Sequence, residues 1–86
     1  MFCQRFGLEV YFTRHARERM VQRRINEEVI SRLLENGTIR YKDDVRLWIA
    51  MSFSERDDNF LCVAVALEDK MIIKTVMHHF QWEVES

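Results

Sequence analysis

The spacing of hydrophobic residues changes at Gly37, and this change limits the chain to one class of fold. Before Gly37, Val29, Ile30, Leu33 and Leu34 recur at helical spacing. After it, apolar and polar residues alternate with a period of two, which is typical of strands that bury one face. Helices that precede a set of antiparallel strands predict an α+β domain.

Two helices are expected between about residues 13 and 37. Thr13 precedes a run of helix formers and can cap a first helix from about Arg14 to Gln22. Asn26 can cap the second helix. That helix is expected to end at Asn36-Gly37, where the glycine can adopt the left-handed conformation.

Strands are expected before and after the helices. Residues 8–13 are rich in β-formers and predict a short N-terminal strand. Polar connectors of hairpin length separate the later apolar segments, which predict strands over 45–53, 60–67 and 71–79, with a short leading strand over 38–41. We therefore expect a sheet of three or four antiparallel strands over about 38–81, with both helices packed on one face.

The size of the chain and its cysteines define the class of protein. Eighty-six residues make one domain, 1–86, and no apolar run approaches the ~20 residues that a membrane span needs. Cys3 and Cys62 cannot build a disulfide framework or a four-ligand zinc site. Cys62 lies in the most apolar strand and is interpreted as an inert core thiol. These features predict a reduced, cytoplasmic domain without a membrane partner.

Positive charge is concentrated in the first predicted helix, although the chain has a formal net charge of -1. The segment from Arg14 to Arg24 holds five arginines, His15 and a single acid, Glu18. A local patch of this kind can hold a phosphate chain on a nearly neutral protein. The residues expected to contact nucleic acid are Arg14, Arg17 and Arg24. The alternative is an ordinary solvated helix face.

His15, Arg19 and Arg23 are spaced at i, i+4 and i+8 and form one stripe beside the apolar face of this helix. Phosphodiester chemistry needs a group that transfers a proton near neutral pH and fixed positive charge for the oxyanion. One histidine and two arginines supply both. In the alternative, His15 only brackets the helix, and the arginines pair with acids such as Glu18, Asp43 or Asp44.

The last predicted strand offers further polar groups. Lys74 and His78 share one face of it and Thr75 and His79 the other, and the flanking apolar residues do not indicate which face meets the helices. Metal binding by His78-His79 is not expected, because neighbouring strand residues point apart and a third ligand is lacking. Three aromatic residues can stack nucleic-acid bases or serve as packing: Tyr41, Trp48 and Trp82.

The segment Thr13 to Ile25 reads T-x-H-A-x-x-R-M-x-x-R-x-I, and the last strand contains Ile72-Ile73-Lys74-Thr75-Val76. Over roughly residues 10–78, this pattern resembles a family of small prokaryotic domains of unknown function. That family is similar in layout to the RelE/ParE-like toxins and to the wider set of metal-independent ribonuclease toxins, which are built from helices followed by an antiparallel sheet. The resemblance implies RNA cleavage.

The resemblance also implies a set of site residues. The motif histidine is His15, its arginines are Arg19 and Arg23, and its strand threonine is Thr75. Lys74 and His79 are added because they lie near Thr75 in the sequence.

The leading hypothesis is thus a toxin-like, metal-independent endoribonuclease that needs no cofactor. RNA is its expected partner, together with a cognate antitoxin or a second copy of the chain. The alternative is a non-catalytic module that binds a protein or a nucleic acid through the basic first helix.

Overall fold

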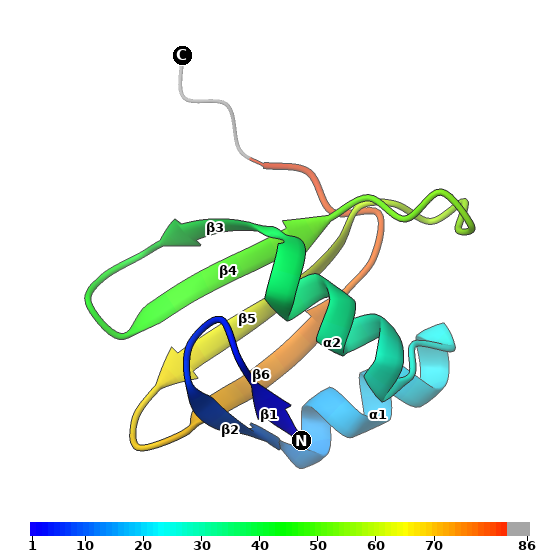
Figure 1. Cartoon of the computed structure of the whole chain (residues 1–86). Helices are drawn as coiled ribbons and strands as arrows, with labels where there is room; N and C mark the ends of the chain where they lie inside the picture. The colour runs from blue at the N-terminus through cyan, green and yellow to red at the C-terminus, as the bar shows by residue number, and fades with distance from the viewer. Residues whose placement is uncertain (83–86) are drawn as a thin grey trace.

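The computed structural model describes residues 1–82, which form two helices and six strands (Figure 1). The chain begins with two short strands, continues with two helices, and ends with four strands. In order these elements are β1 (Phe2–Cys3), β2 (Leu8–Phe12), α1 (Arg14–Arg23), α2 (Glu27–Asn36), β3 (Thr38–Tyr41), β4 (Arg46–Met51), β5 (Leu61–Leu67) and β6 (Met71–Met77). The predicted α+β class is confirmed.

All strands belong to one sheet in the order β1-β2-β6-β5-β4-β3. The antiparallel meander from β3 to β6 was expected, but the predicted sheet of three or four strands is too small, because β1 and β2 extend it to six strands within the described residues. Strand β2 pairs in parallel with β6 through Val10, Tyr11 and Phe12, and β1 pairs with β2. A parallel pair joins segments far apart in the chain, so the local pattern of residues 8–13 did not reveal its partner.

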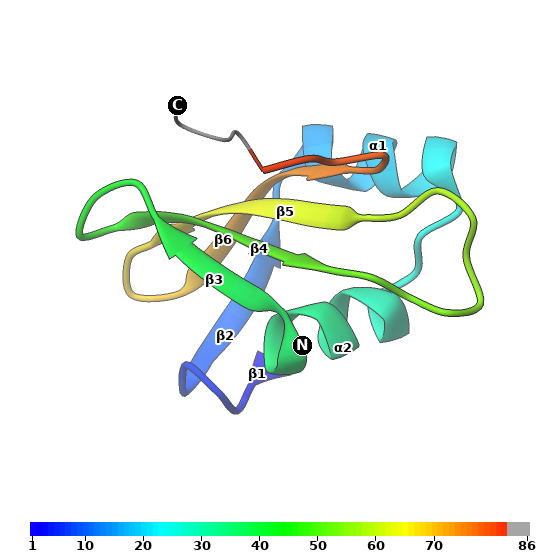
Figure 2. The ribbon, with the colours of Figure 1, turned by 90° about the horizontal axis from the view of Figure 1, so that it is seen from above.

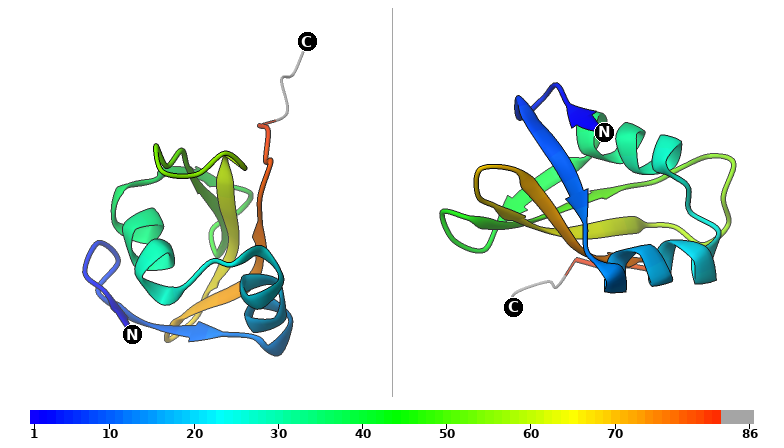
Figure 3. Two further views of the ribbon diagram at one scale, coloured as in Figure 1. Left: turned by 90° about the vertical axis from the view of Figure 1, so that its right-hand side faces the viewer. Right: turned by 90° about the horizontal axis from the view of Figure 1, so that it is seen from below.

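The sheet curls around α2, which lies in its hollow (Figures 2 and 3). Ile30, Leu33 and Leu34 of α2 are completely buried and belong to one core cluster with Leu47 and Ile49 of β4. Because side chains alternate along a strand, Trp48, which lies between these two on β4, points to the opposite, outward face of the sheet. That outward face matters for the site described below.

Helix α1 lies along the edge of β6, and the expectation that both helices pack on one sheet face is therefore wrong. Strand β2 pairs only with the first three residues of β6, and the chain then turns into α1. Thr13 donates its backbone N–H to the Ile73 carbonyl at 3.1 Å and its hydroxyl to the Lys74 carbonyl at 3.1 Å. Arg23 Nη1 donates to the Val76 carbonyl at 2.5 Å. The helix thus satisfies edge carbonyls that a further strand would otherwise bond.

Gly37 ends α2, but not in the conformation expected from the sequence. Its φ of -73° is in the extended region, so a left-handed cap is not the reason for glycine at this position. A Cβ atom here would lie 2.7 Å from the Leu33 carbonyl oxygen and 3.0 Å from that of Ala50. Glycine is needed because the backbones of α2 and β4 approach closely at the start of β3.

Gly37→Ala is therefore expected to destabilise the protein by about 2 kcal/mol, because the added methyl group must displace backbone atoms. The melting temperature should fall by about 10 °C, as measured by thermal denaturation followed by circular dichroism. The control is Thr38→Ala at the next, exposed position, which should change stability by less than ~0.5 kcal/mol. Equal melting temperatures for the two variants would contradict the steric explanation.

Neither helix in residues 1–82 is long and apolar enough to cross a membrane. Cys62 is fully buried, and burial raises the pKa of its thiol to about 12. A thiol with this pKa is protonated at neutral pH, in agreement with its interpretation as an inert core residue.

Candidate functional site

The structure brings His15 of α1 together with Thr75 of β6. His15 Nε2 lies 3.0 Å from Thr75 Oγ1, although the two residues are 60 positions apart in the sequence. His15 is exposed, so solvent and a ligand can reach its ring. The hydroxyl can donate to the imidazole or accept from it, depending on the tautomer. The pair is a group that can transfer a proton at the protein surface.

A bulge in β6 determines which side chains accompany Thr75. Thr75 pairs with Ala64 of β5, whereas Ile73 pairs with Val65, so Lys74 has no direct partner on β5. A bulge of this kind changes the directions in which the neighbouring side chains point. Lys74 is exposed and lines a groove on the outward sheet face together with Ala64. Lys74 precedes Thr75 in β6, and its side chain faces this groove.

The two motif arginines of α1 have different surroundings. Arg23 bonds the Val76 carbonyl of β6, so it holds the helix against the strand. Arg19 is half-buried, and its Nη1 donates to Gln22 Oε1 of the same helix at 2.7 Å. The helical spacing of the stripe places Arg19 between His15 and Arg23, both of which reach β6. Arg19 therefore keeps guanidinium donors for a ligand on this side of α1.

Arg14 and Arg17, two of the three arginines expected to bind nucleic acid, are paired with carboxylates. Arg14 Nε lies 3.3 Å from Glu18, and Arg17 Nη1 lies 2.7 Å from Glu27. The Arg17 guanidinium also lies over the Phe12 ring, 4.3 Å from its centre. These pairs match the alternative in which the arginines of α1 form an ordinary charged surface.

Arg24 adopts the left-handed conformation with φ of 53° and caps α1. His79 lies beyond the end of β6 and not beside the His15–Thr75 pair. Its backbone N–H donates to the Asp58 carbonyl, and its ring lies 4.7 Å from that of His78. The turn after Met77 therefore directs His79 toward the β4–β5 connector.

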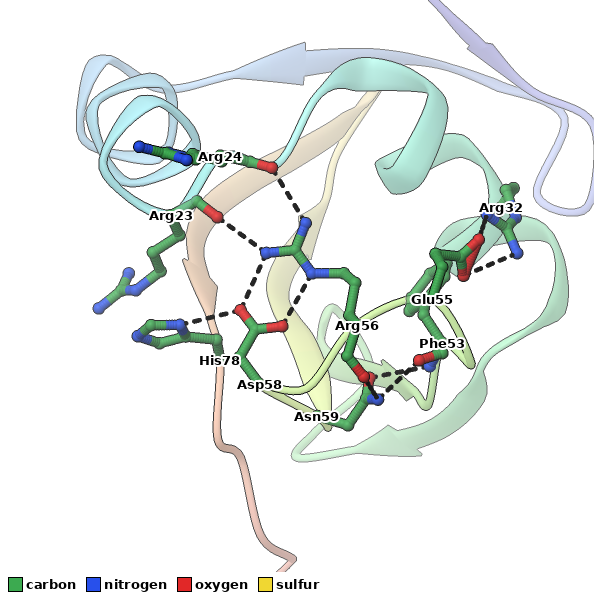
Figure 4. A network of polar contacts seen from close by, with 9 residues as sticks. All are labelled: Arg23, Arg24, Arg32, Phe53, Glu55, Arg56, Asp58, Asn59 and His78. Atoms are coloured by element: carbon green, nitrogen blue, oxygen red, sulfur yellow. Dashed lines mark hydrogen bonds and ion pairs between the residues drawn. The ribbon is translucent and has the colours of Figure 1, made fainter.

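The sequence did not indicate a second polar cluster, which is centred on Arg56 (Figure 4). Its guanidinium bonds both carboxylate oxygens of Asp58, at 2.8 and 2.9 Å, and the carbonyls of Arg23 and Arg24, at 2.8 and 3.0 Å. His78 Nδ1 lies 3.1 Å from the second oxygen of Asp58. We call Arg56, Asp58 and His78 the connector cluster.

The connector cluster fastens the β4–β5 connector to the end of α1. The last carbonyls of a helix have no partner within it, and arginine side chains can supply one. The Arg56 guanidinium holds the pKa of the Asp58 carboxyl well below its usual range, and a hydrogen bond with His78 adds to this effect. Within the polar segment 54–59, the spacing Arg-x-Asp was the one available signal for this cluster.

A family model described as a domain of unknown function (DUF4258) matches residues 12–78. The matched range extends from the end of β2 to the residue after β6 and contains His15, Lys74 and Thr75. No curated protein and no solved structure matches the chain. Because the match covers well over half of the 86 residues, the chain belongs to the DUF4258 family of domains of unknown function.

Proposed function

We propose that this protein is a metal-independent endoribonuclease that acts at the His15–Thr75 pair. The observation that carries the proposal is the 3.0 Å contact between an exposed imidazole nitrogen and a hydroxyl group. The two residues come from the opening motif and the closing strand, and Lys74 adds a positive charge next to them. Proton transfer and oxyanion stabilisation are the two requirements of RNA cleavage.

In the proposed reaction, the 2′-hydroxyl oxygen attacks the adjacent phosphorus, and the bond from phosphorus to the 5′ oxygen breaks. His15 Nε2 accepts the 2′ proton, and the leaving 5′ oxygen takes a proton from solvent. The products are a 2′,3′-cyclic phosphate and a 5′-hydroxyl end. Lys74 and Arg19 stabilise the charge that develops on the phosphate oxygens. Arg23 acts as a positioning residue because its guanidinium holds α1 against β6.

The proposal includes a relationship to the RelE/ParE-like toxins, and it rests on the order of elements. The chain has two helices followed by the antiparallel meander β3 to β6. A cytoplasmic toxin of this kind would act on RNA and be held inactive by a cognate antitoxin. Strand β3 is the last strand of the sheet, so its outer edge is available within the described residues for such a partner or a second copy.

A second candidate function is binding of nucleic acid or protein without catalysis. It is favoured by the hydrogen bonds that Thr13 and Arg23 donate to carbonyls of β6. These bonds give both motif residues a structural role that requires no catalysis. Phosphate binding should weaken steeply with added salt, whereas an apolar protein interface should not.

The experiment that tests the proposed activity is incubation of purified protein with RNA in excess chelator. We expect cleavage products that carry 2′,3′-cyclic phosphate and 5′-hydroxyl ends, because the 2′-hydroxyl is the nucleophile. A substrate with 2′-deoxyribose throughout should remain intact. Intact RNA, both free and on ribosomes, would contradict the nuclease proposal and favour the binding module.

A further inference from the structure

The outward face of the sheet carries a groove that runs beside the His15–Thr75 pair. Its floor is formed by Ala64 and Ala66 of β5, and Trp48 of β4 lies directly opposite Ala64. The outward side is the one away from α2, because the neighbours of Trp48 on β4 are buried in the core. Trp48 is half-buried and lines the groove together with these small residues.

The rim of this groove is positively charged. Lys42, Arg46 and Lys74 line it, and no carboxylate does so within residues 1–82. Lys42 and Lys74 form no ion pair in the same part of the chain, whereas Arg46 is held by Asp43 at 2.6 Å. Hydrogen bonds from Arg46 and from two backbone N–H groups lower the pKa of Asp43 to about 2, so this pair is charged at neutral pH. The rim is complementary to a polyanion.

A second aromatic residue lies on the same face. Arg40 of β3 pairs directly with Trp48 of β4, so both side chains are on the outward side. The Arg40 guanidinium lies over the ring of Trp82, 4.5 Å from its centre. Aromatic rings interleaved with cations are the arrangement by which proteins hold single-stranded nucleic acid, because bases stack on the rings and phosphates meet the cations.

The groove adjoins Thr75 of the proposed catalytic pair through strand pairing. Ala64 on its floor pairs with Thr75, and Lys74 on its rim precedes Thr75 in β6. A nucleic-acid strand whose base stacks on Trp48 would meet Lys74 at the rim and would lie one strand position away from Thr75. A duplex cannot use the indole in this way, because its bases are already stacked and paired.

We propose that this outward groove binds single-stranded RNA and presents its backbone to His15. This inference rests on the proposed nuclease function and deepens it. Single-stranded RNA is the substrate, and the sheet groove, with Trp48 and Lys74, selects it. The arginines of α1 that pair with Glu18 and Glu27 are not the main binding surface.

The test measures binding of a fluorescent 2′-deoxy oligonucleotide of about 10 nucleotides, which the nuclease reaction cannot cleave. Trp48→Leu keeps an apolar side chain but removes the stacking platform, and it should weaken binding about tenfold. Lys42→Gln and Lys74→Gln, both at exposed positions, should each weaken binding several-fold. Each should also make the slope of log K against log salt concentration shallower by about one, because one counterion fewer is released. The matched control Arg14→Gln removes the same charge outside the groove and should have a smaller effect.

Several outcomes separate this inference from the proposed function. Oligonucleotide binding that depends on Trp48 and Lys42, without RNA cleavage, would support the groove and overturn the nuclease. RNA cleavage with unchanged binding by Trp48→Leu and Lys42→Gln would overturn the groove alone. Displacement of the oligonucleotide by polyglutamate or duplex RNA as readily as by single-stranded RNA would also overturn it. Thermal denaturation shows whether Trp48→Leu is folded. If it is not, binding by Lys42→Gln, a substitution at an exposed position, still tests the groove.

Discussion

His15→Ala is expected to slow RNA cleavage at least ~100-fold, because general acid–base catalysis typically contributes a factor of 10²–10⁴. The His15 ring is the one imidazole that the described structure places beside Thr75. Its loss removes the acceptor for the 2′ proton and leaves only solvent in that role. The measurement is the initial rate of cleavage in excess chelator, compared with that of the wild-type protein.

The His15 substitution is not expected to disturb the fold. The side chain is exposed and forms one hydrogen bond, to the hydroxyl of Thr75, within the described residues, so stability should change by no more than ~1 kcal/mol. The matched control is His79→Asn, since asparagine tolerates the positive φ of 51° at that position. His79→Asn should cleave at the wild-type rate, because His79 lies beside the connector cluster. An equal loss of rate in both variants would contradict the assignment of His15.

Thr75→Val separates the two members of the pair. It removes the hydroxyl and nearly preserves the shape of the side chain, so the His15 ring loses its orienting partner while its proton chemistry remains. We therefore expect a smaller loss than for His15→Ala, together with an altered pH profile of the cleavage rate. An unchanged profile would show that the hydroxyl does not position the ring.

The helices could be predicted because their signals are local. Thr13 and Asn26 cap them through hydrogen bonds to backbone N–H groups three residues later, as the sequence indicated. The apolar stripe of α2 at helical spacing likewise corresponds to its buried residues, Ile30, Leu33 and Leu34. Each of these features depends on residues fewer than five positions apart.

Features that join distant segments could not be predicted in the same way. The parallel pairing of β2 with β6 brings Val10 beside Met71, and nothing in either segment specifies the other. The reason for Gly37 is also distant, because the atoms that exclude a side chain include the carbonyl of Ala50. In both cases the controlling contact joins segments that are far apart in the sequence.

The candidate site could be predicted in part from local signals and in part not. Strand periodicity placed Lys74 and Thr75 on opposite faces, and the resemblance to a family motif was needed to associate Thr75 with His15. The bulge opposite Ala64 and Val65 is the physical reason, because it interrupts the alternation at Lys74. The connector cluster was missed because Arg56 bonds backbone carbonyls at the end of α1. Every residue has a backbone carbonyl, so the sequence does not show which of them a side chain will bond.

Arg56→Ala is expected to lower the free energy of unfolding by about 3 kcal/mol and the melting temperature by about 15 °C. The Arg56 and Asp58 side chains are only 18% and 14% exposed, so the pair is shielded from water. Its loss leaves two helix carbonyls without their donor and a partly buried carboxylate that keeps only its contact with His78 among these side chains. The matched control is Arg32→Ala, which breaks an exposed ion pair with Glu55 and should have little effect.

The connector cluster should also make stability depend on pH in the acid range. The folded pKa of Asp58 lies below its unfolded value, so its contribution is complete above about pH 5 and is lost as the pH falls toward the folded pKa. Urea denaturation of the wild-type protein and Asp58→Asn should therefore give stabilities that differ most near neutral pH and converge in acid. A constant difference across this range would show that Asp58 contributes through packing alone, whereas convergence assigns the effect to its charge beside Arg56.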